Sequence, residues 1–104
     1  MLLFPGHQFV VKVLVTELAN RCGLEGKKIL LINSRGIILK DIAPGNNMTT
    51  FIFSVVRKFG SKRGEFLFEI GRKGPKGEGL IRVKLIHSKD EKAIKAAIDS
   101  FVRK

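Results

Sequence analysis

Residues 49–70 read TTFIFSVVRKFGSKRGEFLFEI, and this stretch decides the fold class. Its first half, residues 49–59, is rich in β-branched and aromatic side chains, which favour a strand. Residues 60–64 begin and end with glycine and predict a turn. The return run alternates, with two glutamates and a leucine on one face and apolar side chains on the other. The apolar face consists of Phe66, Phe68 and Ile70. One face of this strand is therefore expected to be buried.

The flanking sequence continues the strand pattern. Upstream, residues 8–15 are dominated by Val, Phe and Leu. Residues 27–33 and 36–42 are two short apolar runs with a Ser-Arg pair between them, which is typical of a β-hairpin. Downstream, residues 80–87 (LIRVKLIH) again alternate between apolar and basic side chains. We therefore expect six or seven strands in all.

The period changes after His87. Ser88 is a candidate N-cap, and Asp90 and Glu91 suit the positive start of a helix. Apolar residues then recur every three or four positions, which predicts one amphipathic helix. These residues are Ile94, Ala97, Ile98, Phe101 and Val102. Strands followed by one C-terminal helix predict a mostly β fold, a sandwich or partly open barrel with one end or edge covered by the helix.

Charge and size limit the possible functions. The chain has 104 residues, the size of one ordinary domain, and a formal net charge of +11. An anionic partner is expected, but net charge alone does not choose between nucleic acid, acidic lipid headgroups and phosphopeptides. A lone Cys22 excludes an internal disulfide, and no apolar run approaches the roughly 20 residues of a membrane span. An intracellular protein is expected.

The sequence offers no set of residues for catalysis or metal binding. His7 and His87 lie at strand margins with no carboxylate or cysteine at ligand spacing, so both are interpreted as solvated strand-end histidines. Cys22 has no histidine nearby in sequence and is interpreted as a small buried hydrophobe. We therefore expect a protein that is not an enzyme and that has no cofactor.

Two further motifs each allow more than one interpretation. Residues 71–79, GRKGPKGEG, could present backbone amides and positive charge to a phosphate, but their glycine spacing alone favours a basic turn between strands. Residues 63–68, RGEFLF, partly match the strand signature of RNA-recognition motifs, whose aromatic rings stack on bases. That fold needs two helices, and only the C-terminal one is predicted here. Phe66 and Phe68 are therefore assigned to the core, and nucleic acid is not expected as a partner.

Two stretches resemble a known family. Residues 51–79, FIFSVVRKFGSKRGEFLFEIGRKGPKGEG, are similar to the paired-strand signature of phosphotyrosine-binding (PTB) domains of the insulin-receptor-substrate type. Residues 16–26, TELANRCGLEG, resemble the same region of the downstream-of-kinase (Dok) adaptors. The resemblance is specific because RKFG, FxFEIGR and GPxGEG recur at the spacing of the family, and it covers nearly the whole chain.

The resemblance implies a PH-like, seven-stranded β-sandwich capped by the C-terminal helix, with residues 1–104 forming a single domain of a larger adaptor. The implied function is binding of a tyrosine-phosphorylated NPxY-type peptide from a receptor tail, in the cytoplasm at the inner face of the plasma membrane. The peptide would add as a strand along the fifth strand, beside the helix.

The resemblance also implies the site residues. By motif position, the two phosphate-binding arginines fall on Arg57 and Arg72, whose planar guanidinium groups can each hold two phosphate oxygens. The supporting lysines are Lys58, Lys73 and Lys76. The expected peptide edge is Phe51, Ile52, Phe53, Ser54, Val55 and Val56. The expected groove wall on the helix is Ile94, Ala97, Ile98 and Phe101.

The positions of the two arginines raise a question of register. If the turn centres on Lys62, Arg57 pairs opposite Leu67, and Arg72 pairs opposite Ile52. That stagger is about five residues, or roughly 17 Å at the rise of a strand. A bulge near Gly60, strand twist with two long side chains, or another role for one arginine would each resolve the conflict.

Two alternative functions stay open. The first is PH-like binding of phosphoinositides or an acidic membrane surface through Lys73, Lys76 and neighbouring lysines. The second is single-stranded nucleic-acid binding built on Phe66 and Phe68. Lipid binding would spread the loss of affinity over many lysines, whereas peptide binding would concentrate it on two arginines. Oligomeric state is not predicted.

Overall fold

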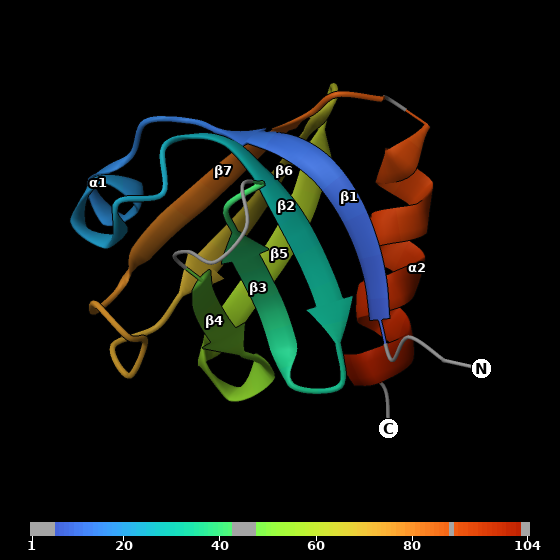
Figure 1. The fold of residues 1–104 in the computed structure, drawn as a ribbon. Coiled ribbons are helices and arrows are strands. Elements are labelled where there is room, and N and C mark those ends of the chain that lie inside the picture. The colour runs from blue at the N-terminus through green and yellow to red at the C-terminus, as the bar shows by residue number, and fades with distance from the viewer. Residues whose placement is uncertain (1–5, 43–47, 88, 103–104) are drawn as a thin grey trace.

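Seven strands and two α-helices make up the described chain. The computed structural model describes residues 6–42, 48–87 and 89–102. In chain order the elements are β1 (Gly6–Val13), α1 (Glu17–Cys22), β2 (Gly26–Asn33), β3 (Gly36–Lys40), β4 (Met48–Ile52), the 3-10 helix η1 (Phe53–Val55), β5 (Val56–Lys62), β6 (Glu65–Ile70), β7 (Gly79–Leu85) and α2 (Asp90–Val102). The strands form one antiparallel sheet in the order β4-β3-β2-β1-β7-β6-β5 (Figure 1).

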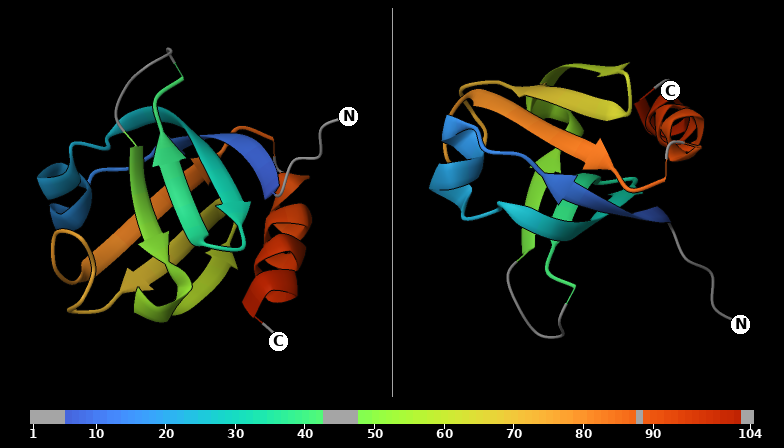
Figure 2. Two further views of the ribbon diagram at one scale, coloured as in Figure 1. Left: turned by 60° about the horizontal axis from the view of Figure 1, so that its bottom comes forward. Right: turned by 90° about the horizontal axis from the view of Figure 1, so that it is seen from above.

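The sheet folds into two layers with the core between them. β1 and β7 share only three paired positions, from Val11–Leu85 to Val13–Val83, and the layers diverge from there (Figure 2). The inner faces of β6 and β7 are buried as their alternation predicted, and so are those of β1, β2 and β3. The mostly β, PH-like architecture with one C-terminal helix is confirmed.

The C-terminal helix covers the core as expected. Ile94, Ala97 and Ile98 of α2 are buried, and Phe101 is half-buried against the same core. Asp90 and Glu91 lie in the first turn, where carboxylates favour the helix dipole. The predicted cap at Ser88, the side chain of Val102 and the last two residues lie outside the described part of the chain.

The short helix α1 was not predicted. Its first turn is capped by Thr16, whose Oγ1 accepts a hydrogen bond from the Ala19 amide at 3.0 Å. It ends at Gly23, which has a left-handed φ of 68° and donates its amide to the last carbonyls. α1 packs against β7, and this contact positions the loop that follows β6.

The prediction of one strand over residues 49–59 was wrong. The chain leaves β4 after Ile52, makes the 3-10 turn η1, and enters β5 at Val56, so β4 and β5 lie at opposite edges of the sheet. The Phe53 amide donates to the Arg35 carbonyl at 3.3 Å and fixes this turn to the β2–β3 hairpin. The apolar side chains on both sides of the break pack toward the core: Phe51, Phe53 and Val55. Because they keep the every-second-residue spacing of a strand, the sequence pattern gives no sign of the 3-10 turn.

Phe101 secures the end of α2 to η1. Its ring stacks on Phe53 with centroids 6.4 Å apart. Replacing Phe101 with alanine is expected to lower the free energy of unfolding by about 2 kcal/mol, because the ring is only half-buried and a fully buried one is worth about 3–5 kcal/mol. Urea denaturation measures this loss, and Lys95→Ala, on the exposed face of the same helix, is the control. A loss no larger than that of Lys95→Ala would contradict the packing role.

Candidate functional site

The free edge of β5 is the first component of the site. Within the described ranges, β5 is the last strand in the sheet and pairs only with β6, so about half of its backbone N–H and C=O groups point away from the ladder. Such an edge is a template for another extended chain, and monomeric proteins usually cover or disrupt it. The edge therefore has the chemistry needed to accept a peptide strand.

The helix α2 runs alongside this edge. Near its start, Glu91 accepts a hydrogen bond from the Ser61 hydroxyl of β5 at 2.6 Å. Near its end, Phe101 stacks on Phe53, just before β5 begins. These two contacts hold the helix antiparallel to the direction of β5 over its whole length, as the views in Figure 2 show. An extended chain bound to β5 would thus lie beside α2.

A bulge in β5 places Arg57 at the beginning of this edge. Val56 pairs with Ile70 and Lys58 pairs with Glu69, so Arg57 is the extra residue between two regular pairs. Its side chain is 61% exposed, and Nη1 lies 3.9 Å from the Glu69 carboxylate. An exposed ion pair at that separation is weak, so a doubly charged phosphate can compete with it.

The structure brings Arg57 and Arg72 to the same corner of the fold. The hairpin turn lies at Arg63–Gly64 because Lys62 pairs with Glu65, so the expected register centred on Lys62 was wrong. The aliphatic stem of Arg57 lies over Gly71, the residue before Arg72, and the Gly71 amide donates to the Val55 carbonyl at 2.8 Å. Arg57 lies opposite the step from Glu69 to Ile70, two to three residues before Arg72, so the expected five-residue stagger is roughly halved. The position of the turn shortens it, and the bulge is at Arg57, not near Gly60.

Gly71 leaves the space in which the stem of Arg57 rests. A Cβ at residue 71 would lie 3.0 Å from Cδ and 3.2 Å from Cγ of Arg57, so an alanine must displace that flexible side chain. Gly71→Ala is expected to lower affinity for a phosphotyrosine peptide about tenfold, by misplacing a charge-assisted contact, with little loss of stability. Isothermal titration against the parent domain tests this, with the melting temperature as the check that the fold is intact. An affinity equal to that of the parent would show that the stem is free to move.

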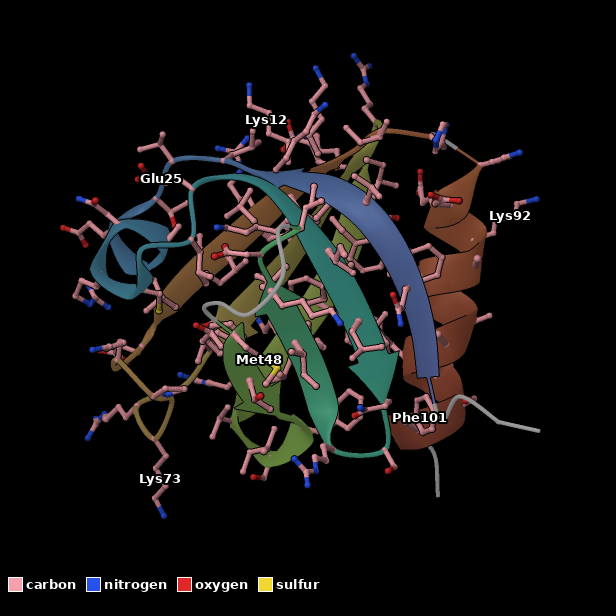
Figure 3. The ribbon with its side chains drawn as sticks, viewed as in Figure 1. Lys12, Glu25, Met48, Lys73, Lys92 and Phe101 are labelled. Carbon is pink, nitrogen blue, oxygen red and sulfur yellow. The ribbon has the colours of Figure 1, made fainter. Side chains whose placement is uncertain are left out.

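The loop between β6 and β7 carries the remaining basic residues and is braced by α1. Lys73 and Lys76 are exposed on this loop, and Lys73 projects from the end of the molecule in Figure 3. Arg21 of α1 donates from Nε to the Lys76 carbonyl at 3.1 Å and from Nη2 to the Glu78 carbonyl at 2.6 Å. Sequence reasoning did not identify Arg21, since its partners are backbone atoms more than 50 residues away, for which the sequence holds no signal.

Of the other candidate residues, Cys22 and His87 do not join this site. Cys22 is half-buried beside Arg21, and burial raises the pKa of its thiol although Lys76 and Arg21 act in the opposite direction. His87 is exposed after β7. Lys58 is exposed on the outer face of β5, opposite Glu69. The described residues contain no group of three side chains suited to a metal ion.

Comparison with known proteins decides the family. The family model for the PTB domain (IRS-1 type) matches residues 12–104 of this chain. The chain belongs to the IRS-1-type PTB-domain family.

Relatives of this PTB domain are docking proteins. It is 38% identical to Docking protein 3 of Homo sapiens over 73 residues, which cover 70% of this chain and 15% of that protein. It is 32% identical to Docking protein 1 of Bos taurus over 93 residues, covering 84% of this chain and 19% of that protein. The chain thus spans less than a fifth of the length of these curated relatives.

The expected peptide edge of this PTB domain requires a structural correction. Of its six residues, only Val56 lies in β5. Phe51 and Ile52 end β4, which pairs with β3 at the opposite side of the sheet, and the other three form the turn η1. The groove-wall residues expected on α2 belong to the core: three of them, Ile94, Ala97 and Ile98, are buried between the helix and the sheet, and Phe101 is half-buried. The strand available beside α2 is Val56–Lys62.

Proposed function

We propose that this PTB domain is a non-catalytic adaptor module that binds tyrosine-phosphorylated NPxY-type segments of receptor tails in the cytoplasm. The peptide adds as a strand to β5 beside α2, and its phosphate is held by Arg57 and Arg72, with Lys58, Lys73 and Lys76 adding positive charge. Membership of the PTB family supports this function. The observation that carries it is the unpaired edge of β5 with two arginines at one end.

The direction of the bound peptide follows from this arrangement. Arg57 lies at the beginning of β5, and Arg72 follows the end of β6, so the phosphate site is at the start of the β5 edge. Residues that precede the phosphotyrosine must then extend along β5 toward Lys62. A peptide whose phosphotyrosine end lies near the start of β5 runs antiparallel to β5. Antiparallel strands form straighter backbone hydrogen bonds than parallel strands. Side chains of the peptide would alternate between α2 and solvent.

The alternative in which Phe66 and Phe68 stack on nucleic-acid bases is excluded by burial. Both rings are inside the core, at 0% and 1% exposure, and they stack on each other with centroids 5.5 Å apart. A base could reach them only after the sheet opened. Among the strands described here, β5 and β6 therefore offer no aromatic platform to a single strand.

Hydrogen exchange tests the proposed strand addition, because this sheet has two free edges. A saturating NPx-phosphotyrosine peptide is expected to slow amide exchange in Val56–Lys62 and leave Met48–Ile52, the edge strand β4, unchanged. The unphosphorylated peptide at the same concentration is the control and should protect the same strand more weakly. Protection confined to Met48–Ile52 would contradict binding at β5, even if phosphorylation still raised the affinity.

A further inference from the structure

A row of four lysines and one glutamate crosses the outer face of the sheet. The strand register places Lys27 opposite Lys12, Lys12 opposite Lys84, Lys84 opposite Glu65, and Glu65 opposite Lys62. We call these five residues the lysine row. Each lysine of the row is exposed, and the buried neighbours of the row face inward on β1, β6 and β7. The row spans five adjacent strands, about 19 Å at the usual strand spacing.

The charges of the lysine row are not compensated within the described protein. Glu65, its only acidic member, bonds Arg82 at 2.8 Å, so it does not neutralise its lysine neighbours. None of the four lysines has a carboxylate within 4 Å among the described residues. Like charges directly opposite each other destabilise a sheet, and three of these lysines are consecutive across β2, β1 and β7. Lysines often protect a sheet edge from pairing with another chain, but these three lie on interior strands, so that explanation does not apply.

Exposed aliphatic side chains border the lysine row. Val10, two residues before Lys12 on the same face, is 41% exposed, and Ile86, two residues after Lys84, is 45% exposed. At the β5 end, the row opens onto a hollow of about 400 Å³ lined by Gly60, Ser61, Lys62, Glu65, Leu67 and Arg82. Basic side chains beside aliphatic ones suit the boundary between lipid headgroups and acyl chains. Nucleic acid is less suited, because the chain has no Trp or Tyr and the nearby phenylalanines face the core.

We propose that the lysine row is a second binding surface, which docks this domain on a membrane containing anionic lipid headgroups. The surface is separate from the phosphate site: Lys12 lies at one end of the molecule and Lys73 at the other (Figure 3). A domain docked in this way would present the β6–β7 loop away from the bilayer. No helix in the described ranges is long and apolar enough to cross a membrane.

Vesicle sedimentation tests the proposal with two variants matched in charge. The probe is phosphatidylcholine vesicles with 20 mol% phosphatidylserine, and pure phosphatidylcholine vesicles are the baseline. Each lysine near an anionic surface is worth about fivefold in partitioning. Lys12→Gln/Lys84→Gln should therefore reduce binding at least tenfold, whereas Lys73→Gln/Lys76→Gln should reduce it less than threefold. The first variant should keep its melting temperature, because it removes a repulsion, and its affinity for phosphopeptide.

Several outcomes would overturn the proposal. Equal losses in the two variants would show that only net charge matters, and equal sedimentation with both kinds of vesicle would show that anionic lipid is not bound. A larger loss in Lys73→Gln/Lys76→Gln would move the lipid site to the β6–β7 loop. If a single-stranded oligonucleotide binds the parent chain and loses affinity in Lys12→Gln/Lys84→Gln while vesicle binding persists, the row serves nucleic acid instead.

Discussion

Arg57→Ala is expected to reduce affinity for an NPx-phosphotyrosine peptide by tenfold to a hundredfold while leaving affinity for the unphosphorylated peptide within twofold. A hydrogen bond to a charged group is worth about 1.5–3 kcal/mol, which gives that range. Stability should hardly change, because the side chain is exposed and its ion pair with Glu69 is long. Isothermal titration with the paired peptides measures both affinities. Arg57→Lys should recover only part of the loss, since an ammonium group lacks the bidentate fork.

A double-mutant cycle with Arg72→Ala sharpens this result. If both guanidinium groups contact one phosphate, the double variant should lose clearly less affinity than the sum of the two single losses. Strict additivity would assign Arg72 to another part of the peptide. Lys95→Ala, on the exposed side of α2, controls for loss of positive charge. An equal fall in affinity for both peptides would remove Arg57 from phosphate recognition altogether.

Gly36→Ala is expected to destabilise the fold by about 3 kcal/mol or more, a large part of the stability of a small domain. Gly36 begins β3 and lies directly against the end of β4. A Cβ there would lie 2.2 Å from the Phe51 carbonyl oxygen and 2.7 Å from Cα of Ile52. Both atoms belong to the backbone, so no side-chain rotation relieves the clash. The strand pair must separate locally.

Urea denaturation measures the effect of Gly36→Ala, and Gly60→Ala is the matched control. Gly60 also lies in a strand, but a Cβ there meets nothing within 4 Å, so its change should stay within about 0.5 kcal/mol. Hydrogen exchange should show that β4 opens first in Gly36→Ala. A urea midpoint equal to that of Gly60→Ala would mean that β3 and β4 can move apart without loss of stability.

Most of the fold could be predicted from alternation and period. β6 begins and ends where the sequence placed it, and α2 buries the expected face. The break at η1 was missed because its apolar residues keep the alternate spacing of a strand. α1 was missed because six residues with two buried side chains, Leu18 and Ala19, are too few to show a helical period. Thr16 and Gly23 were the available signals, one at each end of the helix.

The candidate site was less accessible to sequence reasoning. The motif resemblance identified Arg57 and Arg72 as the phosphate-binding residues. A hairpin turn assumed at Lys62, however, placed the two arginines about five residues apart along the strands. The turn position and the bulge depend on side-chain packing between β5 and β6, which no short pattern specifies. The bracing of the β6–β7 loop by Arg21 depends on tertiary contacts with backbone carbonyls. The lysine row likewise can be recognised only when the strand register is known.

The bulge at Arg57 has a consequence for the length of β5. Val56 and Phe59 both pack against the core although they are three residues apart, an odd interval that a regular strand would send to opposite faces. The extra residue resolves this parity conflict and leaves two consecutive basic side chains outside. Deleting that one residue would restore a regular ladder with both apolar anchors still on the inner face, because they would then be two positions apart. The core does not need the extra residue, so what the bulge adds is a second basic side chain at the start of the edge.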